Sequence, residues 1–271
     1  MRLVRKLLKC IGEIFLLCLV IGGVISKYEK KKCWAEGHKP YGFYEKSVKR
    51  PLDFGLTLFA LFFLWPFLLI CYIAVRIGMG TPVIFKQPRP GLGEEIFTLR
   101  KYRTMTEEKD KDGILLPDEK RLTRFGKKMR STSLDELPEL VNIIKGDMSI
   151  VGPRPQLVRD MVFMSNEHRK RHDVKPGLTG LAQVNGRNGI SWEEKLDMDL
   201  QYIDHISFLG DLKIVLQTVK KVLVRDSINE EGQATASDYG DWLLKNGKVS
   251  QEEYAKKQEE AERLLFEEVS A

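Results

Sequence analysis

The chain has 271 residues, of which 43% are hydrophobic and 30% are charged, and its formal net charge is +6. The charge is uneven, because residues 226–271 carry 12 acidic and 5 basic side chains, which leaves the rest of the chain near +13. The basic part is suited to anions, but charge alone does not distinguish nucleic acid, anionic lipid and nucleotide diphosphates. All four cysteines precede residue 72, so a cysteine metal site or a disulfide framework is excluded from the single soluble domain that follows.

Two apolar runs precede this domain. The first, residues 10–25, is short for a full span and is followed by charged residues without a cleavage site, which favours an uncleaved membrane anchor. If it spans, the basic residues after it place the downstream chain in the cytoplasm. The second, residues 54–75, is long enough to cross a bilayer and contains Pro66. A central proline kinks a helix, so this run either spans as a bent helix or dips into one leaflet and returns.

The next segments are expected to be extended. Residues 81–93 contain too many prolines for a helix and lead into a turn. Residues 95–105 alternate in hydrophobicity as a strand does, which places Lys101 and Arg103 on one face. That face could neutralise a diphosphate, or it could be a solvated surface.

Residues 130–155 contain the greatest concentration of reactive side chains. The apolar residues after Glu136 have helical spacing, and Pro138 fits only in a first turn, so Asp135 is expected to be the N-cap. A helix start favours phosphate, and Arg130 can add a charge-assisted contact. The adjacent carboxylates of Asp135 and Glu136 do not share one face, so one could attack phosphorus while the other holds Mg²⁺. The structural alternative is a pair of ordinary helix-start residues.

Three later features complete the pattern. Gly146 is expected to end the helix, and Pro155 stiffens the backbone that presents Arg154 to a phosphate. Residues 209–224 predict an amphipathic helix with lysines beside its apolar face, which suits either a membrane interface or core packing. The acidic tail predicts a last helix over residues 250–268, docked on the basic body or a partner, or loosely held.

Five motifs, in this order, closely resemble those of the bacterial sugar transferase family, the monotopic polyprenyl-phosphate phosphoglycosyl transferases. They are FKQPRPG, KYRTM, SLDELPEL, GDMSIVGPRP and PGLTGLAQVNGRN, and the resemblance covers about residues 47–226. It implies a helix-rich α+β membrane-associated domain that transfers a sugar 1-phosphate from a UDP-sugar to polyprenyl phosphate. It also implies a covalent phosphosugar-aspartyl intermediate, release of UMP, and a re-entrant membrane helix broken at Pro66. Family members more often have Ser-Pro where this chain has Trp65-Pro66, which puts a hydroxyl contact at the break in doubt.

Residue patterns and resemblance together divide the chain into four parts: an N-terminal anchor and basic linker (1–46), the re-entrant helix (47–80), the catalytic domain (81–226) and an acidic helical tail (227–271). The resemblance implies that Asp135 is the nucleophile and that Glu136 holds Mg²⁺. The implied substrate-binding residues are Lys101, Arg103, Arg130, Arg154, Gln183 and Arg187. The expected partners are the UDP-sugar, polyprenyl phosphate and the membrane, without nucleic acid, and a homo-oligomer is left open. The expected location is the cytoplasmic face of the bacterial inner (plasma) membrane.

Two other classes of function remain open. One is a membrane-tethered basic module that binds nucleic acid or anionic lipid without catalysis, although few aromatic residues accompany the basic ones to stack bases. The other is a non-catalytic scaffold in polysaccharide assembly, against which the intact Asp135-Glu136 pair argues. No motif specifies the sugar.

Overall fold

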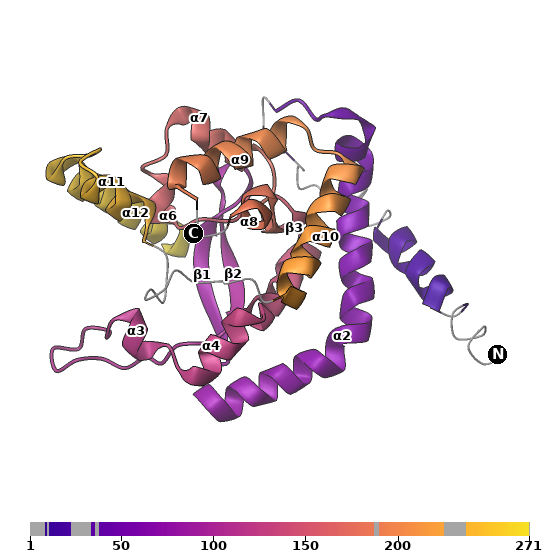
Figure 1. The fold of residues 1–271 in the computed structure, drawn as a ribbon, viewed down its shortest axis with the longest axis horizontal. Helices are drawn as coiled ribbons and strands as arrows, with labels where there is room; N and C mark the ends of the chain where they lie inside the picture. The colour runs from indigo at the N-terminus through magenta and orange to yellow at the C-terminus, as the bar shows by residue number, and fades with distance from the viewer. Residues whose placement is uncertain are drawn as a thin grey trace.

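The computed structural model describes residue 9 and residues 11–22, 34–35, 38–186, 190–224 and 237–270. Figure 1 shows helices arranged around two small sheets, with the long helix α2 along one side. The strands are β1 (Ile84–Pro90), β2 (Ile96–Tyr102), β3 (Ser149–Val151) and β4 (Gly177–Thr179). The α-helices are α2 (Lys49–Met79), α3 (Asp118–Arg121), α4 (Arg124–Ser131), α5 (Leu140–Lys145), α6 (Val158–Met161), α7 (Asn166–Arg169), α8 (Leu181–Asn185), α9 (Trp192–Asp204), α10 (Phe208–Val224), α11 (Tyr239–Lys245) and α12 (Gln251–Ser270). A π-helical turn, η1 (Tyr44–Val48), and the 3₁₀ turns η2 (Leu92–Glu94), η3 (Leu134–Glu139) and η4 (Lys170–Asp173) complete the elements.

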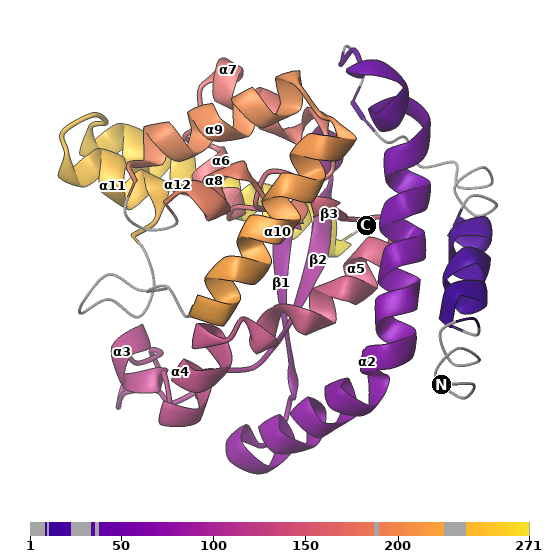
Figure 2. The ribbon, with the colours of Figure 1, turned by 45° about the vertical axis from the view of Figure 1, so that its right-hand side comes forward.

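Helix α2 is a single apolar helix of 31 residues that contains Pro66. Figures 1 and 2 show that it bends sharply partway along its length. Proline has no backbone N–H to give to the preceding turn, and its ring crowds that turn, which is the usual cause of such a bend. Tyr44–Met79 is long and apolar enough to cross a membrane, judged by length and composition among the described residues. The predicted apolar helix over residues 54–75 is therefore confirmed, and it extends further at both ends.

A hydroxyl group does contact α2 just after Pro66. The hydroxyl of Tyr102 donates a 2.9 Å hydrogen bond to the carbonyl oxygen of Leu68. The sequence pair Trp65-Pro66 put such a contact in doubt, because it lacks the serine before the proline. Here the hydroxyl comes from strand β2, and the ring of Tyr102 packs with Cys71 and other buried residues of α2.

The N-terminal helix Ile11–Gly22 lies against the first part of α2. A Cβ atom on Gly55 would lie 2.8 Å from a side-chain carbon of Leu19, and one on Gly22 would lie 2.6 Å from the carbonyl oxygen of Pro51. Glycine allows this close approach of two helix backbones, as it does in many membrane helix pairs. Membrane insertion of the predicted anchor over residues 10–25 stays a prediction.

Strands β1 and β2 form an antiparallel hairpin in which Ile84 lies opposite Tyr102 and Pro90 opposite Ile96. The strand expected over residues 95–105 is confirmed over Ile96–Tyr102 as β2, which ends before Arg103. The segment 81–93 was expected only to be extended, and it pairs as a strand because β1 is an edge strand, where prolines are tolerated.

Asn142 fixes α5 to the outer edge of β2. Its fully buried side-chain amide donates to Thr98 O at 2.8 Å, and its side-chain oxygen accepts from Arg100 N at 3.3 Å. These bonds satisfy backbone groups on the edge of β2 that do not pair with β1. Ile143 of the same helix packs on Leu99, so α5 cannot move independently of β2.

The second sheet pairs β3 and β4 in parallel, with Val151 opposite Thr179. Helices α9 and α10 cover it through a core cluster that includes Val151, Tyr202 and Ile214. The predicted helix over residues 209–224 is confirmed as α10, and core packing accounts for part of its apolar surface, while the role at a membrane interface stays a prediction. Ile214 faces the core, whereas the exposed face carries apolar residues beside lysines.

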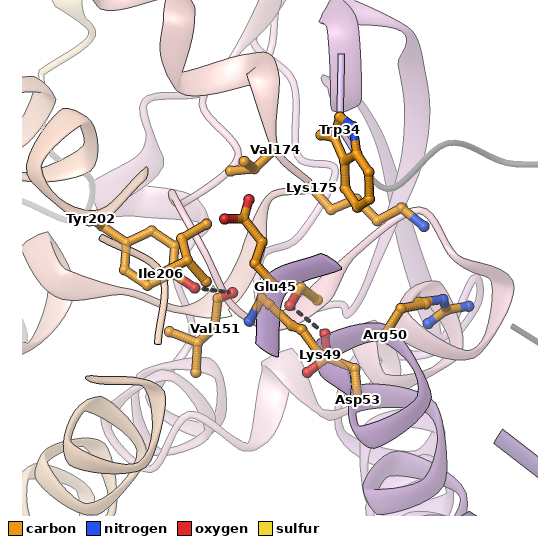
Figure 3. A pocket seen from close by; sticks show the side chains of 11 residues that line it. Trp34, Glu45, Lys49, Arg50, Asp53, Val151, Val174, Lys175, Tyr202 and Ile206 are labelled. Carbon is orange, nitrogen blue, oxygen red and sulfur yellow. Dashed lines mark hydrogen bonds between the residues drawn. The ribbon is translucent and has the colours of Figure 1, made fainter. Parts of the chain in front are cut away.

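A cavity at the start of α2 is lined by several charged side chains, among them Glu45, Lys49 and Asp53, as Figure 3 shows. The ammonium group of Lys49 donates to Asp211 at 2.5 Å, and the hydroxyl of Tyr202 donates to the same carboxylate at 2.9 Å. Ser149 donates to Asp53 of α2 at 2.5 Å. These contacts join α2 to β3, α9 and α10, so they fix the direction in which α2 leaves the domain.

Replacing Asp211 with alanine should destabilise the fold strongly. The substitution leaves the buried ammonium of Lys49 without its acceptor, which costs roughly 3–5 kcal/mol of unfolding free energy. The midpoint of thermal unfolding in detergent should fall by about 10 °C. Asp204→Ala, on the exposed face of α9, is the matched control and should change stability by less than about 0.5 kcal/mol. Equal shifts for the two variants would contradict this role for Asp211.

Candidate functional site

The acidic segment begins with an unusual backbone turn. Ser133 has φ 55° and ψ 20°, a left-handed conformation that is uncommon for residues other than glycine. Leu134–Glu139 then forms the 3₁₀ turn η3, and α5 begins only at Leu140. The prediction that Asp135 is the N-cap of this helix is wrong, because Asp135 lies inside η3. Pro138 explains the difference, since it lacks the N–H that would continue an α-helical ladder through this turn.

Glu136 is the shared acceptor of two cationic side chains. Its Oε1 atom accepts from the ammonium of Lys101 at 2.9 Å and from the guanidinium of Arg154 at 2.7 Å. Lys101 lies near the end of β2 and Arg154 in the loop between β3 and α6. Burial alone would raise the pKa of Glu136, but Arg154 and then Lys101 outweigh it and hold that pKa well below the ordinary range. Glu136 is therefore ionised at every physiological pH.

Asp135 has the opposite electrostatic environment. It is buried, and burial and then the neighbouring charge of Glu136 raise the pKa of its carboxyl. Lys101, Arg130 and Arg154 oppose that rise. Two adjacent carboxylates whose pKa values are shifted in opposite directions are suited to different chemical roles.

Arg130 is held beside Asp135 by the packing of α4 against the end of β2. Its Nε atom donates to the hydroxyl of Thr104 at 3.0 Å. A Cβ atom on Gly126 would lie 1.9 Å from the carbonyl oxygen of Thr104, so α4 approaches this closely only because residue 126 is glycine.

Glu139 is a third acidic residue of the site that sequence reasoning missed. Its side chain is only 3% exposed, and its Oε1 atom lies 3.1 Å from the ammonium of Lys101. Burial raises its pKa to about 7, with a further contribution from Glu136, while Lys101 lowers it. The spacing of three residues from Glu136 could have indicated it, because such residues are neighbours on a helical turn.

The remaining predicted residues lie elsewhere. Arg103 follows the end of β2, is buried, and donates to the carbonyl oxygen of Met79 at the end of α2. Gln183 is on α8 and donates to Leu178 O at 3.2 Å, while Arg187 is outside the described residues. The structure thus brings Lys101 and Arg154 into contact with Glu136. Substrate binding stays a prediction for all six residues, Lys101, Arg103, Arg130, Arg154, Gln183 and Arg187.

The acidic residues alone do not form a complete metal site. Within the described ranges, no group of three His, Cys, Asp or Glu side chains is arranged to hold a metal ion. Lys101 and Arg154 both donate to Oε1 of Glu136, and neither of these two hydrogen bonds uses the other carboxylate oxygen, Oε2. One protein carboxylate together with substrate phosphates is a common environment for Mg²⁺, so the donor set fits such an ion.

Glu139→Gln should make the stability of the protein less dependent on pH. The folded protein keeps the proton on Glu139 up to about pH 7, whereas an unfolded glutamate loses it near pH 4.3, so wild-type stability falls as pH rises between these values. Glutamine is always neutral and avoids this loss, which is roughly 3 kcal/mol when complete. Between pH 5 and pH 8 the variant should therefore gain unfolding free energy relative to wild type. A difference that is the same at both pH values would refute the assignment.

Comparison with known proteins places this arrangement in context. The chain is 48% identical to "Uncharacterized sugar transferase EpsL" of Bacillus subtilis over 192 residues, which is 71% of this chain and 95% of that protein. It is 37% identical to the UDP-glucose:undecaprenyl-phosphate glucose-1-phosphate transferase of Caulobacter vibrioides, over 66% of this chain and 71% of that protein. A protein of the same name from Xanthomonas campestris is 38% identical, but the match spans only 37% of its length. The family described as bacterial sugar transferase matches residues 44–225, which include Lys101, Asp135, Glu136, Glu139 and Arg154. The chain belongs to the bacterial sugar transferase family.

Proposed function

We propose that this protein transfers a sugar 1-phosphate from a UDP-sugar to a polyprenyl phosphate at the membrane, and so starts the assembly of a lipid-linked glycan. The observation that carries the proposal is the contrast between two neighbouring carboxylates. Lys101 and Arg154 hydrogen bond to Glu136 and keep it ionised, whereas burial and the charge of Glu136 raise the pKa of Asp135. The names of the Caulobacter and Xanthomonas relatives support the polyprenyl acceptor and the nucleotide-sugar donor.

Asp135 is the nucleophile in this proposal. Its Oδ atom attacks the β-phosphorus of the UDP-sugar, a bond forms between that oxygen and phosphorus, and the bond to the bridging oxygen breaks. UMP leaves with the electron pair. A desolvated carboxylate of raised pKa is more basic, and therefore more nucleophilic, than one in water. In the second step a phosphate oxygen of polyprenyl phosphate attacks the same phosphorus, and Asp135 leaves as a free carboxylate.

The cations around Asp135 stabilise the charge that develops on the transferring phosphoryl group. Lys101 and Arg154 are already fixed by Glu136, and Arg130 is fixed by Thr104. Such preorganised charges need little rearrangement as the transition state forms. Incoming phosphate oxygens can use the remaining N–H groups of Lys101 and Arg154.

Glu136, through its second oxygen, is the residue that would hold Mg²⁺. A bound Mg²⁺ would neutralise charge on the donor phosphates and on the leaving UMP. The role of this chain is to keep Glu136 ionised and oriented, which Lys101 and Arg154 achieve.

Helix α2 would hold the site beside the lipid acceptor. We infer that α2 enters one leaflet and returns to the same face, because both of its ends are tied to the same domain. Lys49 at its start is bound to Asp211, and Met79 at its end accepts from Arg103. The bend visible in Figure 2 supports this path. The basic residues after the first apolar run favour the cytoplasmic face of the bacterial inner membrane.

Asp135→Asn should abolish the reaction, because a neutral amide cannot attack phosphorus. Purified protein would be incubated with undecaprenyl phosphate, Mg²⁺ and a panel of UDP-sugars that includes UDP-glucose, and UMP would be measured. We expect UMP release to fall by at least about 1,000-fold, and a radiolabelled phosphosugar adduct, formed by wild type without acceptor, to be absent.

Asp204→Asn, an exposed aspartate on α9, is the control for this experiment and should retain normal turnover. Normal UMP release by Asp135→Asn would disprove the nucleophile assignment. Absence of UMP release from wild type with every donor of the panel would disprove the proposed function itself.

A further inference from the structure

The last two helices follow the segment that matches the family, which ends at residue 225. They nevertheless pack on the catalytic domain, as Figure 1 shows beside α6. Ala261 of α12 is 2% exposed and lies in one core cluster with Val158, Met161 and Val162. The tail was expected to be either docked or loosely held, and the described part of it is docked on this domain.

A buried carboxylate joins the tail to α6. Asp160 is 2% exposed, and one of its oxygens accepts from Tyr239 N of α11 at 2.8 Å. Its other oxygen accepts from Leu157 N, the residue before α6, at 3.2 Å. One side chain thus connects the tail with the loop that carries Arg154.

Further contacts fix the tail in the same position. Asp238 forms an ion pair with Arg159 of α6, and Trp192 of α9 donates to Ser237 O at 3.0 Å. Tyr254 of α12 stacks on Phe163, which follows α6, with ring centroids 5.6 Å apart. Apolar, ionic and backbone contacts therefore all hold α6 against the tail.

The loop from Gly152 to Leu157 is bound to β4 through Gly152 N and Pro153 O, and side chains hold its backbone at three further points. Arg171 donates to the carbonyl oxygen of Arg154, and Arg89 of β1 donates to that of Pro155 at 3.2 Å. The third point is the Leu157 N–H bound by Asp160. The first two points depend on residues of the catalytic domain, but the third depends on α6 and on the tail that covers it.

We propose that the hairpin of α11 and α12 is a brace that positions the Arg154 loop for the donor phosphate. The brace acts through α6 and Asp160, and it touches no reacting atom. This inference rests on the proposed function, because only there does Arg154 meet a phosphate. Four-residue helices have little stability of their own, so α6 needs this cover to keep the end of the loop in place.

A pair of matched substitutions on α12 tests the brace in the full-length protein. Ala261→Glu places a charge in the contact with α6, whereas Ala255→Glu makes the same change at an exposed position of the same helix. Hydrogen exchange followed by mass spectrometry needs no turnover. We expect Ala261→Glu to speed exchange about tenfold in peptides covering residues 152–162, with β1 and β2 unchanged, and Ala255→Glu to have no effect.

Kinetics with the donor identified by the panel give the second readout. Ala261→Glu should raise the donor KM about tenfold in the wild-type background and less than twofold in an Arg154→Lys background, because the effect passes through Arg154. Loss of general stability alone would lower the active fraction equally in both backgrounds and leave KM unchanged.

Asp160→Asn provides a second variant if Ala261→Glu does not fold. It keeps the size of the side chain but turns an amide N–H toward one of the two backbone donors, and it should increase exchange in the same peptides. Unchanged exchange of the loop, exchange that rises equally across the domain, or equal KM effects in both backgrounds would each overturn the brace. Failure of all turnover would remove the proposed function, and the exchange measurement would still decide whether the tail holds the loop.

Discussion

The carboxylate of Glu136, bound by Lys101 and Arg154 through one oxygen, is the interaction on which the rest of the site depends. Two partly buried cations and a partly buried acid would each be unfavourable alone, and together they offset the loss of hydration. Lys101 lies in β2, Glu136 in η3 and Arg154 in the loop between β3 and α6. The ion pairs therefore form only when these three segments are folded together. The same cations offset the cost of burying the Asp135 carboxylate less completely. The pKa of Asp135 is therefore raised, whereas that of Glu136 is lowered.

The alternation of side chains along β2 connects this site to the membrane helix. Neighbouring residues of a strand point to opposite faces, and here Lys101 reaches the acidic residues while Tyr102 reaches the carbonyl oxygen of Leu68 in α2. A rigid strand thus sets the distance between the acidic residues that bind Lys101 and helix α2. In the proposed reaction, β2 would therefore determine how far the acidic residues lie from a lipid phosphate beside α2.

The sequence was sufficient for the features that depend on local pattern. Residue spacing and motif order predicted the apolar helix around Pro66, the strand that carries Lys101, the end of α5 at Gly146 and the acidic pair. The sequence was insufficient for the features that depend on tertiary packing. Asp135 was assigned to an N-cap because an α-helical start was assumed, and the left-handed Ser133 is visible only in three dimensions. Glu139 was missed since its raised pKa comes from burial, and Arg103 followed the strand pattern in sequence but lies beyond the end of β2.

The tail shows why the boundary of a family match need not be the boundary of a folding unit. Val158, Met161 and Val162 lie inside the matched segment, yet their cover includes Ala261, Leu264 and Leu265, which lie outside it. Without that cover, Val158 and Met161 of α6 and Val162 just after it would be more exposed to water, and burial of such side chains contributes on the order of 1.5–3 kcal/mol each. The acidic surface of α12 keeps the hairpin soluble on its outer side, while its narrow apolar stripe meets α6. The tail is therefore part of the hydrophobic core that holds the Arg154 loop, although its composition differs from that of the domain it covers.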